Sequence, residues 1–288
     1  MDVIAHHAAD RLLTVGRGHP YSREALFQLT AGLEGFDVCH VEQPVAQRLV
    51  GVQTAAEFSA MLCYDMPGVD FTVEDAPRAI EPDAAFVANF HAMLEAGIGM
   101  VFLHHALAAW PAWPGYAEVV GGRFHYRGAI LRGTEWPDSG YRHGVTHRIR
   151  RVAQHPVTEG LPDVFEMTDE LYLCPVFERD VLPLLASDYD FRAENFYSAA
   201  MAVAGQMHSR EGWTHPAGSS LVGWATHAGS SPIVYLQGGD DATAMANPHF
   251  KRLVHNAVRW VSGDEARAWA WARARTKGTA PGAAMGAQ

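Results

Sequence analysis

The sequence is poor in lysine and cysteine, and this scarcity excludes several kinds of chemistry. Lys251 and Lys277 are the only lysines in 288 residues, so a Schiff-base lysine, a pyridoxal-phosphate anchor and a P-loop lysine are not expected. The three cysteines, Cys39, Cys63 and Cys174, show no CxxC spacing and lie in or beside apolar runs. This pattern predicts reduced, buried thiols that fill the core.

Long apolar runs and clustered positive charge are also missing. No segment reaches the roughly 18 uninterrupted apolar residues of a membrane span, and no basic segment precedes an apolar one at the N-terminus. We therefore expect a cytoplasmic protein. The net charge of −10 argues against a nucleic-acid or anionic-membrane partner, because binding to phosphates needs clustered Lys and Arg.

Familiar catalytic and nucleotide-binding motifs are absent as well. The sequence contains neither GxSxG nor HExxH. The stretch VGRGHPY, from Val15, supplies only the first two glycines of a GxGxxG pattern and has Tyr21 at the third position, so it predicts no nucleotide site. Candidate functional residues therefore have to be found from their places in the predicted fold.

Short apolar runs alternate with longer helix-compatible segments, which predicts an α/β fold with a mostly parallel sheet covered by helices on both faces. We predict one domain over residues 1–263, followed over 264–288 by a C-terminal helix end and a flexible tail. A loosely patterned excursion spans 121–144. The predicted strands are 12–15, 36–41, 58–64, 100–103, 146–152, 169–173, 181–187, 220–226 and 232–237, and the predicted helices are 21–35, 82–96, 113–120 and 248–260.

Ligands of an open parallel sheet bind beyond the carboxyl ends of its strands. His104 follows an apolar strand at a strand-to-helix turn, which predicts a site role, whereas His105 points the other way and is expected to pack. Glu170 lies in a strand between apolar neighbours, where burial would raise its pKa and suit acid–base catalysis; a structural ion pair is the alternative. Further polar residues near strand ends are His19, Tyr21, Asp65, His227 and Asp240.

Two kinds of ligand are suggested by the aromatic and imidazole side chains. Trp113 offers a flat face on which a sugar ring could stack, with core packing as the alternative. His125 belongs to the excursion, either as a wall of the site or as plain surface. Imidazoles and a carboxylate also suit a Zn-like divalent cation with an open coordination position, so a metal stays one alternative and no other cofactor is expected.

Five segments occur in a recognisable order: GRGHPYSREAL (16–26), EAGIGMVFLHHA (95–106), YAEVVGGRFHY (116–126), HPVTEGLPDVFEMTDELY (155–172) and SSPIVYLQGGDDATAMANPHFKRLVHNAVRW (230–260). Together they resemble the ThuA-like family, named for trehalose utilisation. The resemblance implies the flavodoxin-like, doubly wound fold of the class I glutamine amidotransferase-like superfamily. It also implies a role in carbohydrate catabolism, with a keto sugar as substrate. Those amidotransferases carry a nucleophilic cysteine at the turn that holds His104 here, so amidotransferase chemistry is not expected.

The resemblance also implies site residues, namely His19, His104, Glu170 and Asp240. Glu170 or His104 would act as the base, and the other, together with His19, as a hydrogen-bonding or electrophilic partner. The reaction would be isomerisation, elimination or hydrolysis of a keto sugar or glycoside. The residues expected to bind the substrate are Tyr21, Asp65, Trp113, His125, His227 and Asp240.

The sequence departs from the family pattern at one position. The pattern is commonly Gly-His-Asp, whereas this chain has glycine at Gly239, and His227 is a candidate to compensate. The departure leaves open a non-catalytic sugar-binding or regulatory protein, and the imidazole and carboxylate residues leave open a metal-assisted hydrolase of a small polar substrate. The expected partner is a small sugar, and a homodimer is the default expectation for an α/β protein of this kind.

Overall fold

The computed structural model describes residues 10–276, and its centre is a parallel sheet. The parallel strands run in the order β14-β6-β3-β1-β2, which is the flavodoxin-like order. Apart from the edge strand β2, each is buried because apolar residues follow one another along it, as in Leu12 and Leu13. The bounds are β1 (Asp10–Arg17), β2 (Phe36–Glu42), β3 (Ala60–Asp65), β6 (Gly99–Leu103) and β14 (Ser231–Leu236).

An antiparallel extension continues the sheet beyond β14. Its order is β14-β13-β11-β9-β10, with the two-residue β12 also paired to β9. The predicted excursion 121–144 contains a small hairpin and the first residues of β9, so its end belongs to the sheet. The bounds are β9 (Gly140–Arg151), β10 (Val164–Leu173), β11 (Leu182–Ser187), β12 (Tyr197–Ser198) and β13 (Leu221–Ala228), and the separate hairpins are β4 (Val69–Asp70) with β5 (Arg78–Ala79) and β7 (Ala129–Leu131) with β8 (Thr134–Trp136).

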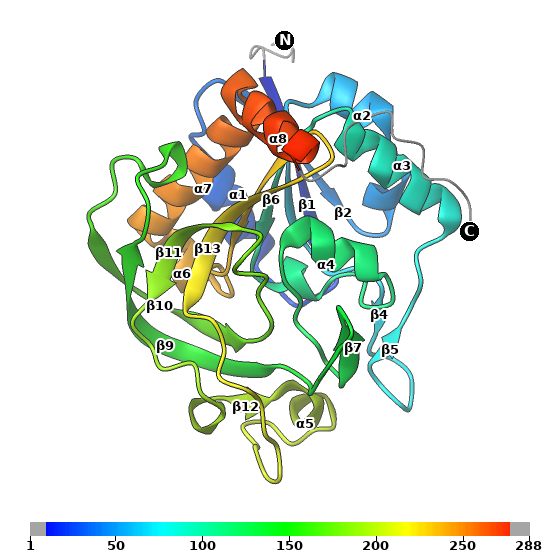
Figure 1. Ribbon diagram of the computed structural model, residues 1–288, viewed down its shortest axis with the longest axis vertical. Coiled ribbons are helices and arrows are strands. Elements are labelled where there is room, and N and C mark those ends of the chain that lie inside the picture. Colours follow the sequence, from blue (N-terminus) through cyan, green and yellow to red (C-terminus); the bar gives the residue numbers. More distant parts are fainter. Residues whose placement is uncertain (1–9, 277–288) are drawn as a thin grey trace.

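Side-chain caps set the starts of several helices. Ser22 accepts a hydrogen bond from the Ala25 amide (3.1 Å) at the first helix, and Asn247 accepts one from the His249 amide (2.9 Å) at the seventh. Figure 1 shows α1 and α7 on one side of β1 and β6, and α2 and α3 on the other. The bounds are α1 (Arg23–Thr30), α2 (Val52–Glu57), α3 (Ala84–Glu95), α4 (Pro114–Val120), α5 (Ala199–Val203), α6 (Ala242–Ala246), α7 (Pro248–Ser262) and α8 (Asp264–Thr276).

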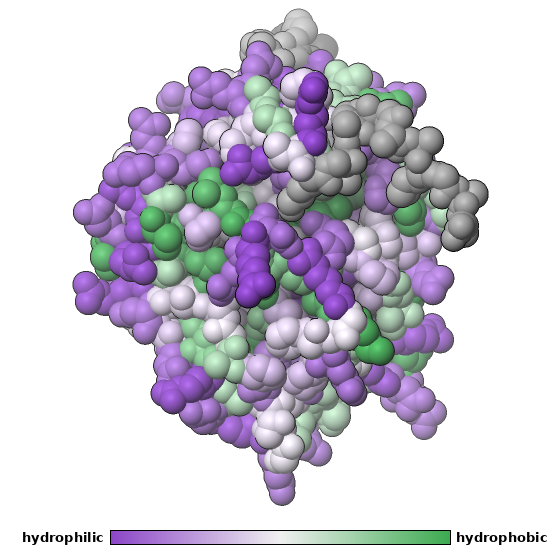
Figure 2. Space-filling model, in the orientation of Figure 1, coloured by the Kyte–Doolittle hydropathy of each residue, from purple (hydrophilic) through white to green (hydrophobic). Residues whose placement is uncertain are grey.

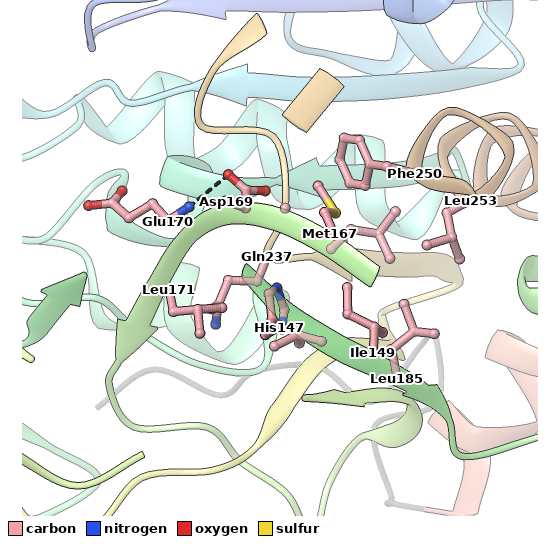
Figure 3. Close-up of a pocket in the computed structure, with 13 residues that line it drawn as sticks. His147, Ile149, Met167, Asp169, Glu170, Leu171, Leu185, Gln237, Phe250 and Leu253 are labelled. Atoms are coloured by element: carbon pink, nitrogen blue, oxygen red, sulfur yellow. Dashed lines mark hydrogen bonds between the residues drawn. The ribbon is translucent and has the colours of Figure 1, made fainter. Parts of the chain in front are cut away.

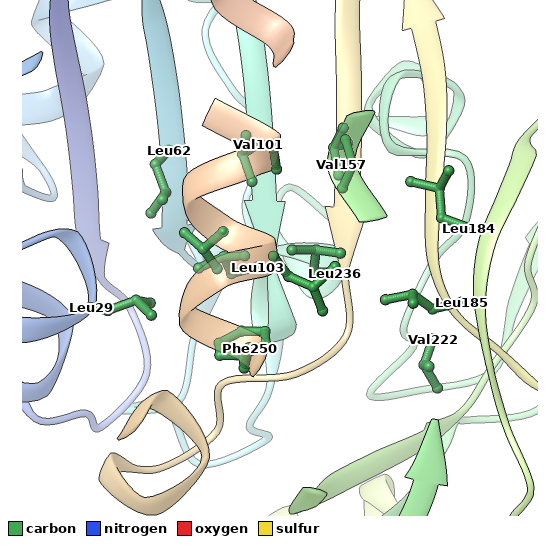
Figure 4. Close-up of a cluster of buried hydrophobic side chains, with 14 of the residues drawn as sticks. Leu29, Leu62, Val101, Leu103, Val157, Leu184, Leu185, Val222, Leu236 and Phe250 are labelled. Atoms are coloured by element: carbon green, nitrogen blue, oxygen red, sulfur yellow. The ribbon is translucent and has the colours of Figure 1, made fainter. Parts of the chain in front are cut away.

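Hydrophobic cores lie on both faces of the sheet, as a doubly wound fold requires. On one face, residues of β6 and β14 pack against α7; Figure 4 shows Leu103 and Leu236 beside Phe250. On the other face, Phe102 of β6 packs in a second core with Phe86 and residues of α4. The alternation along β6 supplies both cores, so the predicted fold class is confirmed.

The C-terminal region differs from the prediction. Where a helix end and a flexible tail were expected, α8 is a regular helix that buries Ala266, Ala270 and Ala274. These residues are four apart and form one face, which packs on β13 and β14. Their small size hid the core pattern in the sequence. The expected tail beyond residue 276 lies outside the described residues.

Among residues 10–276, every helix is too short or too polar to cross a bilayer. Figure 2 shows, on the face drawn, small hydrophobic groups separated by hydrophilic side chains. Cys63 and Cys174 are buried free thiols as predicted, but Cys39 is exposed because it lies on the edge strand β2.

Candidate active site

His104 lies at the junction where β6 ends and a short 3-10 helix (His104–Ala108) begins. Its side chain is fully buried, and its φ of +46° is a left-handed conformation that few non-glycine residues adopt. Such strained residues cluster at functional sites. Its Nδ1 lies 2.7 Å from the carbonyl oxygen of Gln237, which can only accept a hydrogen bond, so Nδ1 carries a proton.

Three oxygen atoms surround the other ring nitrogen, Nε2. The Tyr172 hydroxyl lies at 2.7 Å, Glu170 Oε2 at 3.0 Å and Asp240 Oδ1 at 3.3 Å. The Tyr172 ring also stacks on the imidazole, with ring centroids 4.6 Å apart. Glu170 and Tyr172 come from one face of β10, and Asp240 comes from the loop after β14. We call His104, Glu170 and Asp240 the His104 cluster.

The His104 cluster is an imidazolium between two carboxylates. Burial opposes a charge on His104, but hydrogen bonds to Asp240 and Glu170 outweigh it and raise the pKa of the imidazole well above its ordinary value. Burial would raise the pKa of Asp240, but the hydrogen bond to His104 lowers it. No lysine or arginine among residues 10–276 pairs with either carboxylate.

Two more imidazoles border the cluster. His143, on β9, places Nε2 3.1 Å from Glu170 Oε1 and is partly exposed. His19, in the loop after β1, stacks on His105 with ring centroids 4.7 Å apart. Burial and the charge on His104 lower the pKa of His19, so His19 is more readily neutral than His104. The site therefore offers both a proton donor and a proton acceptor.

The strand that carries Glu170 is irregular at this point. The pairing of β10 with β9 shifts register after Asp169, which is a β-bulge of the kind that re-aims side chains. Asp169 is buried and accepts hydrogen bonds from the backbone N–H groups of Gly239 (2.6 Å) and Asp240 (3.1 Å). Figure 3 shows the side chains of Asp169 and Glu170 pointing in different directions. Asp169 thus fixes the loop of Asp240, while Glu170 faces His104.

A cavity of about 430 Å³ opens onto Glu170. Its other polar walls are His19 and His143, and most of the remaining lining is aromatic or aliphatic. Its size and mixed lining are those of a small-molecule site. The aromatic residues are Phe71, Phe124, Tyr126, Tyr141 and Tyr172, and α5 contributes Ala199, Ala202 and Val203.

Of the sequence-predicted residues, the structure brings together His104, Glu170 and Asp240, with His19 beside them. Asp65 lies at the expected strand end but on the other face. It accepts a hydrogen bond from Gln43 (2.7 Å), and burial raises its pKa to about 7. Its neighbour Tyr64 faces the site instead and donates to the Gly239 carbonyl (2.7 Å), because successive strand residues point to opposite faces.

Tyr21 and Trp113 also lie away from the His104 cluster. The Tyr21 hydroxyl donates to Glu42 (2.8 Å), which is the last residue of β2. Trp113 packs edge-on against Phe90 of α3, with ring centroids 5.4 Å apart. Trp113 therefore has the packing role that was its alternative, and the aromatic walls of the cavity come from other residues.

His125 and His227 also lie away from the His104 cluster. His125 lines a different cavity, of about 530 Å³, beside Arg127. β13 runs antiparallel to β14, so its carboxyl end, with His227, lies at the edge of the sheet opposite the site. The structure therefore does not let His227 replace an imidazole at Gly239. Gly239 itself has φ of +107°, which favours glycine.

Sequence reasoning missed three groups that touch His104 or Glu170. Tyr172 is two residues after Glu170, so the two-residue period of a strand could have placed it on the same face. His143 fell in the excursion, although the alternation of burial along β9 begins near it. Gln237 acts through its backbone carbonyl, for which the side-chain type gives no signal.

The fold and the site together define a class: flavodoxin-like α/β proteins in which a buried histidine, paired with carboxylates, occupies the turn after β6. The model of the ThuA family, described as trehalose utilisation, matches residues 24–261. The chain belongs to this family.

Solved structures agree on the fold. A ThuA-like protein from Parabacteroides merdae (15% identity, TM-score 0.60) covers 89% of this chain and 90% of its own, and one from Bacteroides uniformis (17% identity, TM-score 0.60) covers 90% and 94%. A cytoplasmic protein from Salmonella typhimurium, at 9% identity and TM-score 0.51, covers 87% and 99%. No curated protein sequence matches the chain. At these identities the likeness concerns the fold alone.

Proposed function

We propose that this protein is an enzyme of carbohydrate catabolism that acts on a keto sugar or glycoside by acid–base chemistry. The observation that carries the proposal is the His104 cluster, an imidazolium and two carboxylates, of which Glu170 lines a cavity with aromatic walls. Titratable groups perturbed in this way favour a catalytic site. The family's description as trehalose utilisation supports a sugar derivative as the substrate.

The chemistry needs a base beside a carbonyl and a group that polarises the carbonyl oxygen. His104 is protonated and therefore suits the polarising role, with Asp240 holding its charge. Glu170 is the base, because its Oε1 faces away from His104 towards His143, which can pass the proton on. Removing the hydrogen beside the carbonyl gives an enediolate.

The enediolate has two outcomes that use the same groups. Reprotonation at the neighbouring carbon completes an isomerisation. Loss of a glycosidic leaving group, protonated as it departs, completes an elimination, and addition of water to the product gives net hydrolysis. Tyr126 and Tyr141 offer ring faces for the apolar side of the sugar, while His19 is available to its hydroxyl groups.

The cysteines argue against an amidotransferase. The nucleophile of such an enzyme has to stand at the turn that His104 occupies. Cys63 lies within β3 and Cys174 lies just after β10, and burial raises the pKa of both thiols. Cys39 lies on β2 at the edge of the sheet. None of the three lies at the turn, and the two buried thiols also lack the acidity that thiolate catalysis requires.

The test is turnover of 3-keto glycosides by the purified protein, followed by mass spectrometry. We expect Glu170→Gln to lower the rate by about 100-fold or more, which is the usual contribution of a general base. Glu166→Gln is the matched control, because Glu166 is exposed on the same strand.

Two results would contradict the proposal. A folded Glu170→Gln protein that turned over substrate at the wild-type rate would remove the assigned base. Calorimetric binding of keto glycosides by a wild-type protein that transforms none of them would identify a non-catalytic sugar-binding protein, the alternative raised by Gly239.

A further inference from the structure

We propose that the His104 cluster binds one divalent cation of the Zn²⁺ or Mn²⁺ type through His104 Nε2, Glu170 Oε2 and Asp240 Oδ1. These three side chains can each offer one ligand atom, with all three atoms within 4.8 Å of one another. The inference rests on the proposed function and deepens it. The cation takes the place of the imidazolium proton as the group that polarises the keto oxygen.

The spacing of the atoms around Nε2 fits a metal better than it fits hydrogen bonds alone. Nε2 lies 3.0 Å from Glu170 Oε2 and 3.3 Å from Asp240 Oδ1. Two ligands bound tetrahedrally at Zn²⁺ distances stand about 3.3 Å apart. The Tyr172 hydroxyl lies nearer still, at 2.7 Å. A ring nitrogen has one proton or one lone pair, so it can serve only one of these three oxygens well, whereas a cation on the lone pair serves both carboxylates.

The hydrogen bond at the other ring nitrogen of His104, Nδ1, also suits a metal ligand. His104 Nδ1 donates its proton to the Gln237 carbonyl at 2.7 Å, which leaves Nε2 as the ligand atom when the ring is neutral. A carbonyl acceptor at the other ring nitrogen is the usual partner of a metal-binding histidine. Asp169 holds the Asp240 backbone at 3.1 Å, and so fixes the third ligand.

The charges favour a cation as well. Asp169, Glu170 and Asp240 place three carboxylates side by side, and no lysine or arginine in the described part of the chain pairs with any of them. The side chains that pair with the two ligand carboxylates are imidazoles, His104 at both and His143 at Glu170. A divalent ion would supply two positive charges at the point where both ligand carboxylates converge, and it would displace the proton of Nε2.

The ligand set also leaves room for a substrate. Three protein ligands are typical of catalytic sites, where a further coordination position remains open. The cavity reaches Glu170, so a keto oxygen can approach this position from the cavity side. Glu170 Oε1 and His143 lie on that side too, 3.1 Å apart, and remain available for proton transfer.

The test is metal binding by the full chain, independent of activity. Protein stripped with a chelator is titrated with Zn²⁺ and with Mn²⁺ by calorimetry, and its thermal midpoint is measured. We expect one ion per chain, a raised midpoint, and tighter binding at higher pH because a proton leaves Nε2. His104→Ala and Asp240→Asn should bind at least about tenfold more weakly. His227→Ala and Glu166→Gln are the matched controls and should bind like the wild type.

The outcomes separate this site from the proposed function. Absence of binding to the wild type at millimolar ion, or equal binding by His104→Ala, overturns the cation site. Full turnover of keto glycoside by the stripped protein also overturns it and leaves the proposed function intact. One bound ion, lost in His104→Ala, together with no turnover of any keto sugar, supports the site and overturns the function.

Discussion

Two aspartates near the carboxyl ends of β3 and β14 are in opposite electrostatic states. Asp240 lies beside a protonated imidazole, and its hydrogen bond to His104 lowers its pKa in spite of burial. Within residues 10–276, the side-chain partner of Asp65 is the neutral Gln43 amide alone, so burial prevails and raises its pKa to about 7. The partner, and not the residue type, decides which carboxylate stays charged.

The pKa of Asp65 predicts a pH-dependent stability. An unfolded aspartate loses its proton near pH 3.8 and the folded Asp65 near 7, so wild-type stability falls as the pH rises between these values. Asp65→Asn has no proton to lose and keeps an oxygen for Gln43. We expect it to exceed the wild type in free energy of unfolding at about pH 8, on the order of 2–4 kcal/mol, with the gain shrinking towards pH 4. Urea unfolding across this range measures it, and a gain independent of pH would contradict it.

At the scale of elements, α8 shows how a helix can pack without an obvious apolar stripe. Its fully buried residues are alanines, and of its two tryptophans Trp269 is partly buried against the core while Trp271 is exposed. Alanine lets the helix approach β13 and β14 closely. The sequence around it, rich in arginine and alanine, resembles that of a frayed end, and only the four-residue spacing of Ala266, Ala270 and Ala274 distinguishes the two.

Leucine substitutions test this packing. Ala270→Leu places a larger side chain against the sheet, and we expect a loss of about 1–3 kcal/mol in the free energy of unfolding. Ala268→Leu is the matched control: Ala268 is exposed on the same helix and should change stability by less than about 0.5 kcal/mol. Thermal unfolding measures both. Equal effects of the two substitutions would show that α8 does not pack as described.

At the scale of the whole molecule, the parallel half was predictable because all its strands except the edge strand β2 are buried and stand out as apolar runs, as at β6. In the antiparallel half the strands were predicted, but the pairing of β9 with β10 and β11 was not, because pairing between strands far apart in the sequence has no local signal. His227 lies on β13, which runs away from the site. His104, Glu170 and Asp240 could be named in advance, but the bulge at Asp169 and the backbone partner at Gln237 depend on tertiary pairing.

The exposure of the three cysteines tests how the sheet is packed. Cys39 is exposed, whereas Cys63 and Cys174 are buried and burial raises the pKa of Cys174 to about 12. We expect a thiol reagent at about pH 8 to modify one cysteine rapidly in the native protein and all three after unfolding in urea. Cys39→Ser should abolish the rapid phase, and two rapid thiols in the native wild type would contradict the packing of the sheet.

β14 is the strand that joins the two halves, since it pairs with β6 on one side and β13 on the other. It is also the last strand in the chain among residues 10–276. During synthesis, His104 and Glu170 are therefore made long before the sheet that brings them together can close. Until β14 is made, the newly synthesised chain has an open, apolar sheet edge at β6, and such edges are sites at which unfinished chains associate.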